Sequence, residues 1–206
     1  METIASLVTI LAVLIVGVIS PGPSFLLVAQ TAVSQSRKAA VFSAFGMALG
    51  ATILCIFVLL GLQAVLQQFP RAYLAIKLAG AAYLVYLAIK LWLAASKTVA
   101  LDADAVVPRT PYRHFTVALG VMLTNPKAAI QYGVLFGTFI PANPPLGLVL
   151  ILPICVFTME AGWYCFVAYA LSSQRSKLSY LSAKRYIDRF ASVLLGGMGI
   201  RLLLIK

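Results

Sequence analysis

The chain has 206 residues, of which 62% are hydrophobic and 10% are charged, and its mean hydropathy is +1.00. This composition leaves too little polar surface to cover a water-soluble domain, so it predicts a protein that lies in a lipid bilayer. The net charge of +11 does not indicate a nucleic-acid-binding protein, because the basic residues are scattered over the segments between apolar runs.

Six apolar runs predict an all-α, multi-pass fold with about six transmembrane helices, since each helical span needs about 20 residues. The runs cover residues 3–32, 39–63, 73–93, 115–140, 146–171 and 191–205. The first and fourth are longer than a straight span requires, so we expect these helices to be tilted or locally unwound. The first run carries Glu2 in place of a basic start and continues past a proline motif, so we do not expect a cleaved signal peptide.

The basic residues predict how these spans are oriented. The even-numbered connections and the C-terminal tail carry only Arg71 and Lys206, whereas the odd-numbered connections are rich in Lys and Arg. Basic residues near span ends are retained in the cytoplasm, so we expect the odd connections inside and both termini outside. The basic residues of the odd connections are Arg37, Lys38, Lys97, Arg109, Arg113, Arg175, Lys177, Lys184, Arg185 and Arg189.

Residues 94–113 contain two acidic residues and two prolines and lack an apolar period, which predicts a flexible linker. The linker divides one transmembrane domain, residues 1–206, into a first repeat of about residues 1–93 and a second of about 114–206. Because each repeat has three spans, the second is expected to insert upside down, as an inverted repeat. The segment 172–190 mixes apolar and basic residues, which predicts either an interfacial helix on anionic lipid or a solvated loop.

Two proline motifs interrupt the first and fourth runs. Proline removes a backbone donor, so within a membrane it is tolerated only where the freed carbonyls meet protein, water or substrate. Broken helices at corresponding positions of two halves mark the binding sites of transporters, and we expect the two motifs to face each other at mid-depth. The motifs are Ser20, Pro21, Gly22 and Pro23, followed by Ser24, and Asn125, Pro126 and Lys127.

Several polar residues at these motifs are candidates for substrate binding. Ser20 and Ser24 either bind substrate or merely satisfy the carbonyls that the prolines leave free. Gly22 allows a ligand to approach the backbone closely. Asn125 is the stronger candidate at the second motif, because its amide can both cap the following helix and bind a ligand. Gln131 supplies a further polar group on that helix, as does Tyr132.

Lys127 and Glu160 are the deepest ionisable residues of the predicted spans, each roughly 16–18 Å of helix from the inner end of its run. Burying a charge in lipid costs several kcal/mol, so such residues are candidates for function. We expect Glu160 to bind a proton or a substrate ammonium, and Lys127 and free amides to receive a carboxylate. The alternative is a structural ion pair. Tyr164, one turn from Glu160, is expected to line the same cavity.

Other residues suggest packing rather than chemistry. Closely spaced glycines at Gly46 and Gly50, and near Gly196 and Gly199, permit close helix contacts, either within one subunit or in a homodimer. Lys90, near a span end, is expected to extend its ammonium to the interface. No metal site and no cofactor are expected.

The motifs together resemble the LysE/RhtB family of bacterial amino-acid exporters, most closely its threonine (homoserine/threonine) branch. The resemblance covers nearly the whole chain and is carried by SPGPSFLLVAQTAVSQSRKAA at 20–40, KLAGAAYLVYLAIKLW at 77–92, LTNPKAA at 123–129 and EAGW at 160–163. It implies a six-helix protein of the bacterial inner membrane that exports small amino acids, coupled to proton entry. We therefore expect a transporter and not an enzyme, and alternating access is the mechanism consistent with the residues at the two breaks.

Two departures from the family pattern bear on the substrate. Ser24 stands where members often have Asp or Asn, and Ala51 and Thr52 stand where many members have an acidic residue. The missing acidic groups weaken the case for a dibasic substrate such as lysine and favour threonine, homoserine or another neutral amino acid.

Two other classes of function remain as alternatives. A carrier of a metal ion or a signal molecule is one, although a metal carrier needs several converging acidic, His or Cys ligands and only Glu160 is evident. A membrane thiol oxidoreductase is the other, although it needs two thiols that can meet. The sequence contains Cys55, Cys155 and Cys165, all within apolar runs and without C-x-x-C spacing.

Overall fold

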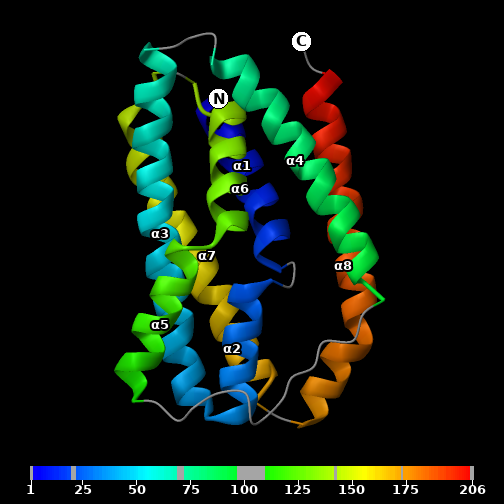
Figure 1. Cartoon of the computed structure of the whole chain (residues 1–206). Helices are drawn as coiled ribbons and strands as arrows, with labels where there is room; N and C mark the ends of the chain where they lie inside the picture. The colour runs from blue at the N-terminus through cyan, green and yellow to red at the C-terminus, as the bar shows by residue number, and fades with distance from the viewer. Residues whose placement is uncertain are drawn as a thin grey trace.

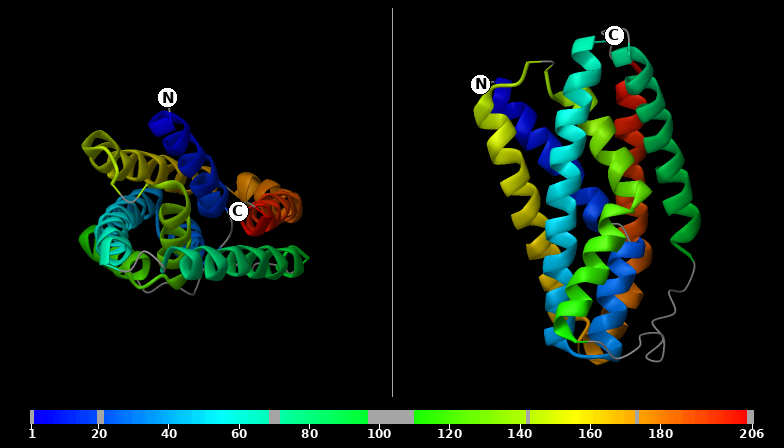
Figure 2. Two further views of the ribbon diagram at one scale, coloured as in Figure 1. Left: turned by 90° about the horizontal axis from the view of Figure 1, so that it is seen from above. Right: turned by 60° about the vertical axis from the view of Figure 1, so that its left-hand side comes forward.

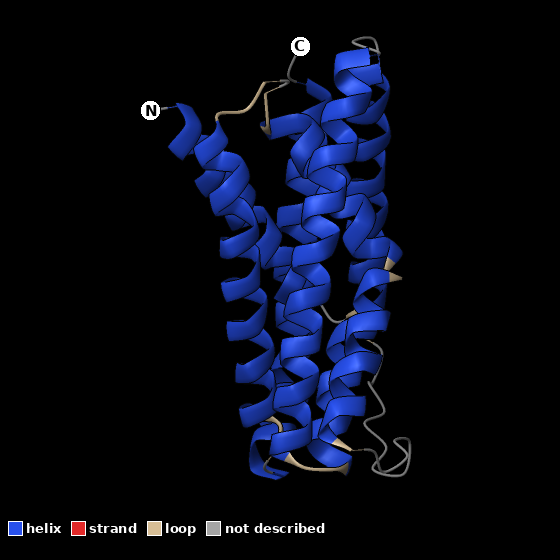
Figure 3. Cartoon of the chain, turned by 90° about the vertical axis from the view of Figure 1, so that its left-hand side faces the viewer, coloured by secondary structure: helices blue, strands red, loops and turns tan. Residues whose placement is uncertain are grey.

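The computed structural model describes residues 2–19, 22–68, 72–96, 110–141, 143–172 and 174–204, and their regular structure is entirely helical (Figures 1 and 3). The all-α prediction is therefore confirmed for this part of the chain. The eight helices of the described residues are α1 (Glu2–Ile19), α2 (Pro23–Ser34), α3 (Arg37–Gln68), α4 (Ala72–Ala94), α5 (Pro111–Leu123), α6 (Pro126–Phe139), α7 (Leu146–Ala170) and α8 (Gln174–Leu204).

Both proline motifs interrupt helices, as predicted. α1 ends at Ile19 and α2 begins at Pro23, while α5 ends at Leu123 and α6 begins at Pro126. Proline is favoured in the first turn of a helix, where its missing N–H needs no partner, and it cannot continue the preceding helix. The same residue type therefore ends one helix segment and starts the next.

Within the described ranges, two helices are long and apolar enough to cross a membrane, α3 over Arg37–Leu62 and α7 over Leu146–Ala170. A third span results if the segments Leu7–Ile19 and Pro23–Ser34, which are bent by 53°, count as one broken helix. Large apolar side chains such as Phe57 and Leu146 are exposed on the outside of the bundle, where lipid would cover them. The arrangement of six spans in two inverted repeats stays a prediction.

The last helix differs from its prediction. α8 is continuous from Gln174, so the solvated-loop interpretation of 172–190 is wrong for the residues described, and the helix begins 17 residues before the predicted start at 191. The physical reason is a buried stripe: Asp188, Ser192 and Leu195 recur at helical spacing and are all buried. The hydroxyl of Ser192 donates to the carbonyl oxygen of Ala88 on α4 at 2.6 Å. The linker residues 97–109 lie outside the described residues.

The connections that the charge pattern predicts on one side of the membrane lie at the same end of the bundle. The Arg37 guanidinium at the start of α3 donates to Ser172 Oγ at 3.1 Å and lies 4.9 Å from the ring centroid of Tyr169, at the end of α7. The first and fifth connections therefore share one end of the bundle, as predicted. α1 begins and α8 ends at the other end (Figures 1 and 2). Which end faces the cytoplasm stays a prediction from the basic residues.

In the part of the chain that the structure describes, the buried apolar residues form two clusters. The larger cluster joins α1, α2, α3, α5, α6 and α7. The smaller one joins α4 and α8 through residues such as Leu84, Ala88 and Leu195, and it reaches α6 at Val134. The pair α4 and α8 thus forms a layer beside the main bundle, visible from above in Figure 2.

Glycines allow helices within this one chain to approach closely. A Cβ at Gly46 would collide with the carbonyl oxygen of Phe115, and one at Gly50 would lie 2.8 Å from Met122 Cβ, so both glycines pack α3 against α5. On α8, a Cβ at Gly199 would lie 3.0 Å from the carbonyl oxygen of Ala81. The homodimer stays a prediction, because these glycines are used inside the subunit.

We predict that Gly50→Ala lowers the free energy of unfolding by about 1–3 kcal/mol, because the added methyl group overpacks the contact between α3 and α5. Gly162→Ala is the matched control, since a Cβ there meets nothing within 4 Å. Thermal unfolding of the purified protein in detergent measures both. Equal stability of the two variants would show that the α3–α5 contact is not close.

Candidate functional site

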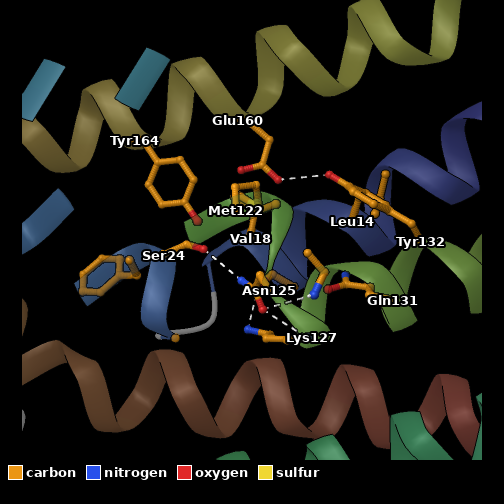
Figure 4. A pocket seen from close by; sticks show the side chains of 14 residues that line it. Leu14, Val18, Ser24, Met122, Asn125, Lys127, Gln131, Tyr132, Glu160 and Tyr164 are labelled. Carbon is orange, nitrogen blue, oxygen red and sulfur yellow. Dashed lines mark hydrogen bonds between the residues drawn. The ribbon is translucent and has the colours of Figure 1, made fainter. Parts of the chain in front are cut away.

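The two helix breaks meet at a buried hydrogen bond. Asn125 Nδ2, at the second break, donates to Ser24 Oγ, just after the first break, at 2.9 Å (Figure 4). The two side chains are only 8% and 4% exposed although they are 101 residues apart in the chain. The expected meeting of the two proline motifs is therefore present in the structure.

Asn125 also caps α6. Its Oδ1 accepts from the backbone N–H groups of Lys127, at 3.0 Å, and Ala128, at 3.4 Å. Asparagine is a favoured N-cap because its side chain satisfies amides that have no partner in the first turn. The cap was predicted, but its consequence corrects another expectation: these amides of the second break are engaged by Asn125 and are not free to bind a carboxylate.

Lys127 replaces a backbone donor that the first break removes. In a continuous helix the carbonyl of Gly17 would accept from the N–H of residue 21, but that residue is proline. Lys127 Nζ donates to the Gly17 carbonyl oxygen instead, at 3.1 Å. The ammonium from the second break thus satisfies a carbonyl freed by the first, and the charge is held beside both breaks.

Glu160 lies on the opposite side of the site, on α7. Buried residues recur at every fourth position of this helix, and Glu160 and Tyr164 continue the stripe begun by Leu152 and Val156. Glu160 is 3% exposed, and its Oε1 accepts from the hydroxyl of Tyr132 on α6 at 3.2 Å. Its Oε2 is buried and has no hydrogen-bond partner among the described residues.

A cavity of about 30 Å³ lies between these groups. Seven of the predicted site residues line it: Gly22, Ser24, Asn125, Lys127, Gln131, Glu160 and Tyr164. The small-molecule sites of proteins are about 300 Å³ or larger, so this cavity holds water but is too small for an amino acid. Binding of a larger molecule requires the helices around it to move apart.

Lys127 and Glu160 contact different partners on two sides of the cavity, as Figure 4 shows. Their charges nevertheless interact electrostatically. A cation and a carboxylate that flank one cavity complement a zwitterion, because each can bind the group of opposite charge. The arrangement therefore suits an amino acid better than a molecule of single charge.

The other predicted site residues are placed less centrally. Pro23 and Pro126 border a different, larger cavity. Ser20 and Pro21 lie outside the described residues. Gln131, by contrast, lines the small cavity, as stated above. Its side-chain amide packs against Gly17, where a Cβ would collide with it, and Gln131 Nε2 is buried without a hydrogen-bond partner in the described part of the chain.

Three residues of the site or its surroundings were missed or left unassigned by sequence reasoning. Tyr132 was noted as polar but not assigned to the site, although it supplies the hydrogen bond to Glu160. Gly17 could have been found, because its position four residues before Pro21 predicts a free carbonyl. Asp188 is 1% exposed and interacts electrostatically with Lys127. The sequence did contain one indication that Asp188 lies on a buried helix face, namely its helical spacing to Ser192 and Leu195.

No group of three or more His, Cys, Asp or Glu side chains that could hold a metal ion occurs among the described residues. Cys55, Cys155 and Cys165 are all free cysteines.

The fold and site together define a class: a helical membrane protein with a buried polar site where two broken helices meet, an arrangement typical of transporters. The LysE type translocator family matches residues 15–206, and the chain belongs to this family. The resemblance inferred from the sequence motifs is thereby confirmed.

Curated relatives cover almost the whole chain. The threonine efflux protein of Escherichia coli (strain K12) is 31% identical, over 95% of this chain and 96% of its own length. The threonine efflux protein of Salmonella typhi is 32% identical over the same shares. The uncharacterized membrane protein YrhP of Bacillus subtilis (strain 168) is 26% identical, over 89% of this chain and 91% of its own length. No solved structure matches the chain.

We predict that Ser24 and Asn125 are energetically coupled by about 1 kcal/mol, since the buried bond between them joins the two breaks. A double-mutant cycle of Ser24→Ala and Asn125→Ala, followed by unfolding in detergent, measures the coupling. Asn125→Ala alone should cost more than Ser24→Ala, because it also removes the cap of α6. Strictly additive effects would contradict the contact between the breaks.

Proposed function

We propose that this protein exports small neutral amino acids, of the size and chemistry of threonine or homoserine, from the cytoplasm. The observation that carries the proposal is the pair of opposite charges, the half-buried Lys127 and the buried Glu160, on two sides of the cavity at the helix breaks. The names of the Escherichia coli and Salmonella relatives support threonine as the first substrate to test.

In this proposal the substrate carboxylate binds Lys127 and the substrate ammonium binds Glu160. Glu160 Oε2 is the available acceptor, because Oε1 already accepts from Tyr132 and Oε2 has no hydrogen-bond partner in the described residues. Lys127 can turn from the Gly17 carbonyl to the carboxylate, which offers it a stronger, charge-assisted hydrogen bond. Ser24 and Tyr164, which lie close together beside the cavity, offer hydroxyls to the substrate (Figure 4).

The residues around the cavity support a neutral side chain. Among the described residues, Glu160 is the one acidic residue that lines it, and that carboxylate is needed for the substrate ammonium. A second ammonium, as in lysine, would be buried there without a counter-ion, at a cost of several kcal/mol. The proposal therefore favours threonine and homoserine over lysine.

Proton antiport by alternating access completes the proposal. Lys127, Tyr132 and Tyr164 are the titratable groups that interact with the Glu160 carboxyl. When Glu160 takes up a proton from the outside, it loses its charge and releases the substrate ammonium outward. The proton then leaves toward the cytoplasm when the halves return, so one site serves substrate and proton in turn. In this proposal the small cavity belongs to a closed conformation of the transport cycle.

The remaining features of the proposal are the location of the protein and its orientation in the membrane. The protein is placed in the bacterial inner membrane as a multi-pass domain of two inverted three-span repeats, with the odd-numbered connections in the cytoplasm. The basic residues of those connections support this orientation. A homodimer is also part of the proposal.

Uptake into inside-out membrane vesicles with an acidic interior tests transport and coupling together. We expect accumulation of radiolabelled threonine and homoserine but not of lysine, and loss of accumulation when an uncoupler collapses the proton gradient. Glu160→Gln should reduce gradient-driven accumulation to background, because the amide can neither bind a proton nor carry the negative charge.

Lys38→Gln is the matched control for this experiment, since it removes the charge of an exposed lysine at the start of α3. It should transport like the wild type. If Glu160→Gln accumulated threonine with normal dependence on the gradient, the coupling role would be wrong. If the wild type, shown to be in the membrane, moved none of these amino acids, the cargo would have to be sought elsewhere.

A further inference from the structure

A second cavity, of about 340 Å³, lies on the other side of the helix breaks, between them and the layer formed by α4 and α8. We call it the α4 chamber. Tyr83, Tyr86 and Lys90 of α4 and Leu195 of α8 form one wall. The opposite wall includes Gly22, Asn125 and Lys127, which also line the small cavity. These three residues therefore separate two compartments that lie in series.

The charged side chains that line the α4 chamber are basic among the described residues. Lys90 and Lys127 both border it, and no Asp or Glu is among its described lining residues. α2 begins at its wall, at Pro23, and the first turn of a helix carries a partial positive charge. These groups together favour an anion such as a carboxylate.

The rest of the chamber suits the body of an amino acid. Leu87, Leu91 and Leu195 supply apolar surface, and the aromatic rings of Tyr83 and Tyr86 lie 6.1 Å apart between their centroids. The ammonium of Lys90 lies 5.8 Å from the centroid of the Tyr86 ring, which holds the charge at the wall. The volume falls within the range of small-molecule sites, in contrast to the small cavity.

We propose that the α4 chamber is a first binding site for the transported amino acid, in which Lys90 binds the carboxylate before the substrate reaches the cavity between the breaks. This inference rests on the proposed function. The carboxylate then passes from Lys90 to Lys127, which faces both compartments, so it always has a cation beside it. The chamber extends along α4 to Ala94, the end that the charge pattern places toward the cytoplasm, from which an exporter must load.

The concentration dependence of uptake into inside-out vesicles tests the role of Lys90, because their outer face is the cytoplasmic one. Lys90→Gln should raise the half-saturating threonine concentration by about tenfold, the effect of losing one charge-assisted hydrogen bond, while the maximal rate is largely kept. Lys90→Arg should restore a low half-saturating concentration. Lys127→Gln should reduce the maximal rate as well, since Lys127 lines both compartments.

Lys38→Gln is again the control, as an exposed lysine that borders neither cavity. If Lys90→Gln had the same half-saturating concentration as Lys38→Gln while Lys127→Gln failed to transport, the chamber proposal would be overturned and the proposed function would stand. If the wild type moved no amino acid, both would fall.

Labelling of a single cysteine separates a substrate carboxylate from a lipid phosphate as the anion in the chamber. Ala94→Cys is introduced after Cys55, Cys155 and Cys165 have been replaced, and the purified protein is reacted with a maleimide. We expect threonine to slow the labelling several-fold in vesicles of neutral and of anionic lipid alike. Labelling that responds to anionic lipid but not to threonine would assign the chamber to lipid and overturn the proposal.

Discussion

The structure depends on backbone hydrogen bonds that proline cannot make. Pro21 and Pro126 each remove an N–H from a helix within an apolar bundle, and each freed carbonyl must find another donor. At the first break the donor is the Lys127 ammonium, which reaches the Gly17 carbonyl. At the second, the backbone N–H of Asn125 bonds to the carbonyl of Met122, four residues before Pro126, at 3.1 Å. The replacement donor at the first break comes from the second break, so this hydrogen bond draws the two breaks together and brings a charge into the interior.

The same constraint explains why the interior is suited to transport. Lys127 is held by its hydrogen bond to the Gly17 carbonyl oxygen, beside the cavity in which the proposed substrate binds. Glu160 is held comparably by the Tyr132 hydroxyl. Had the two charges been locked in a direct ion pair, a zwitterion would have had to break it. The two compartments then follow from packing, since α4 and α8 form their own apolar cluster beside the bundle and leave the α4 chamber between.

Much of this site could be predicted from the sequence, because its main determinants are local. The prolines predict the breaks, Asn125 before Pro126 predicts a cap, and the depths of Lys127 and Glu160 in their runs predict that they share one level. The partners of these side chains could not be predicted, since the contact of Lys127 with Gly17 depends on how α1 and α6 pack. Asp188 was missed because basic neighbours made its segment look like a connection, whereas the buried stripe of α8 shows it to be helical and packed.

Direct binding of threonine tests the central claim, that a zwitterion binds between the two breaks, without the complications of transport. Scintillation proximity with tritiated threonine on the purified protein measures binding in the wild type, in Lys127→Gln and in Lys38→Gln. The account predicts saturable binding in the wild type and in Lys38→Gln, and a loss of affinity of tenfold or more, about 1.4 kcal/mol, in Lys127→Gln. Equal affinity in all three proteins would contradict it, because the cation at the breaks would then have no part in holding the substrate.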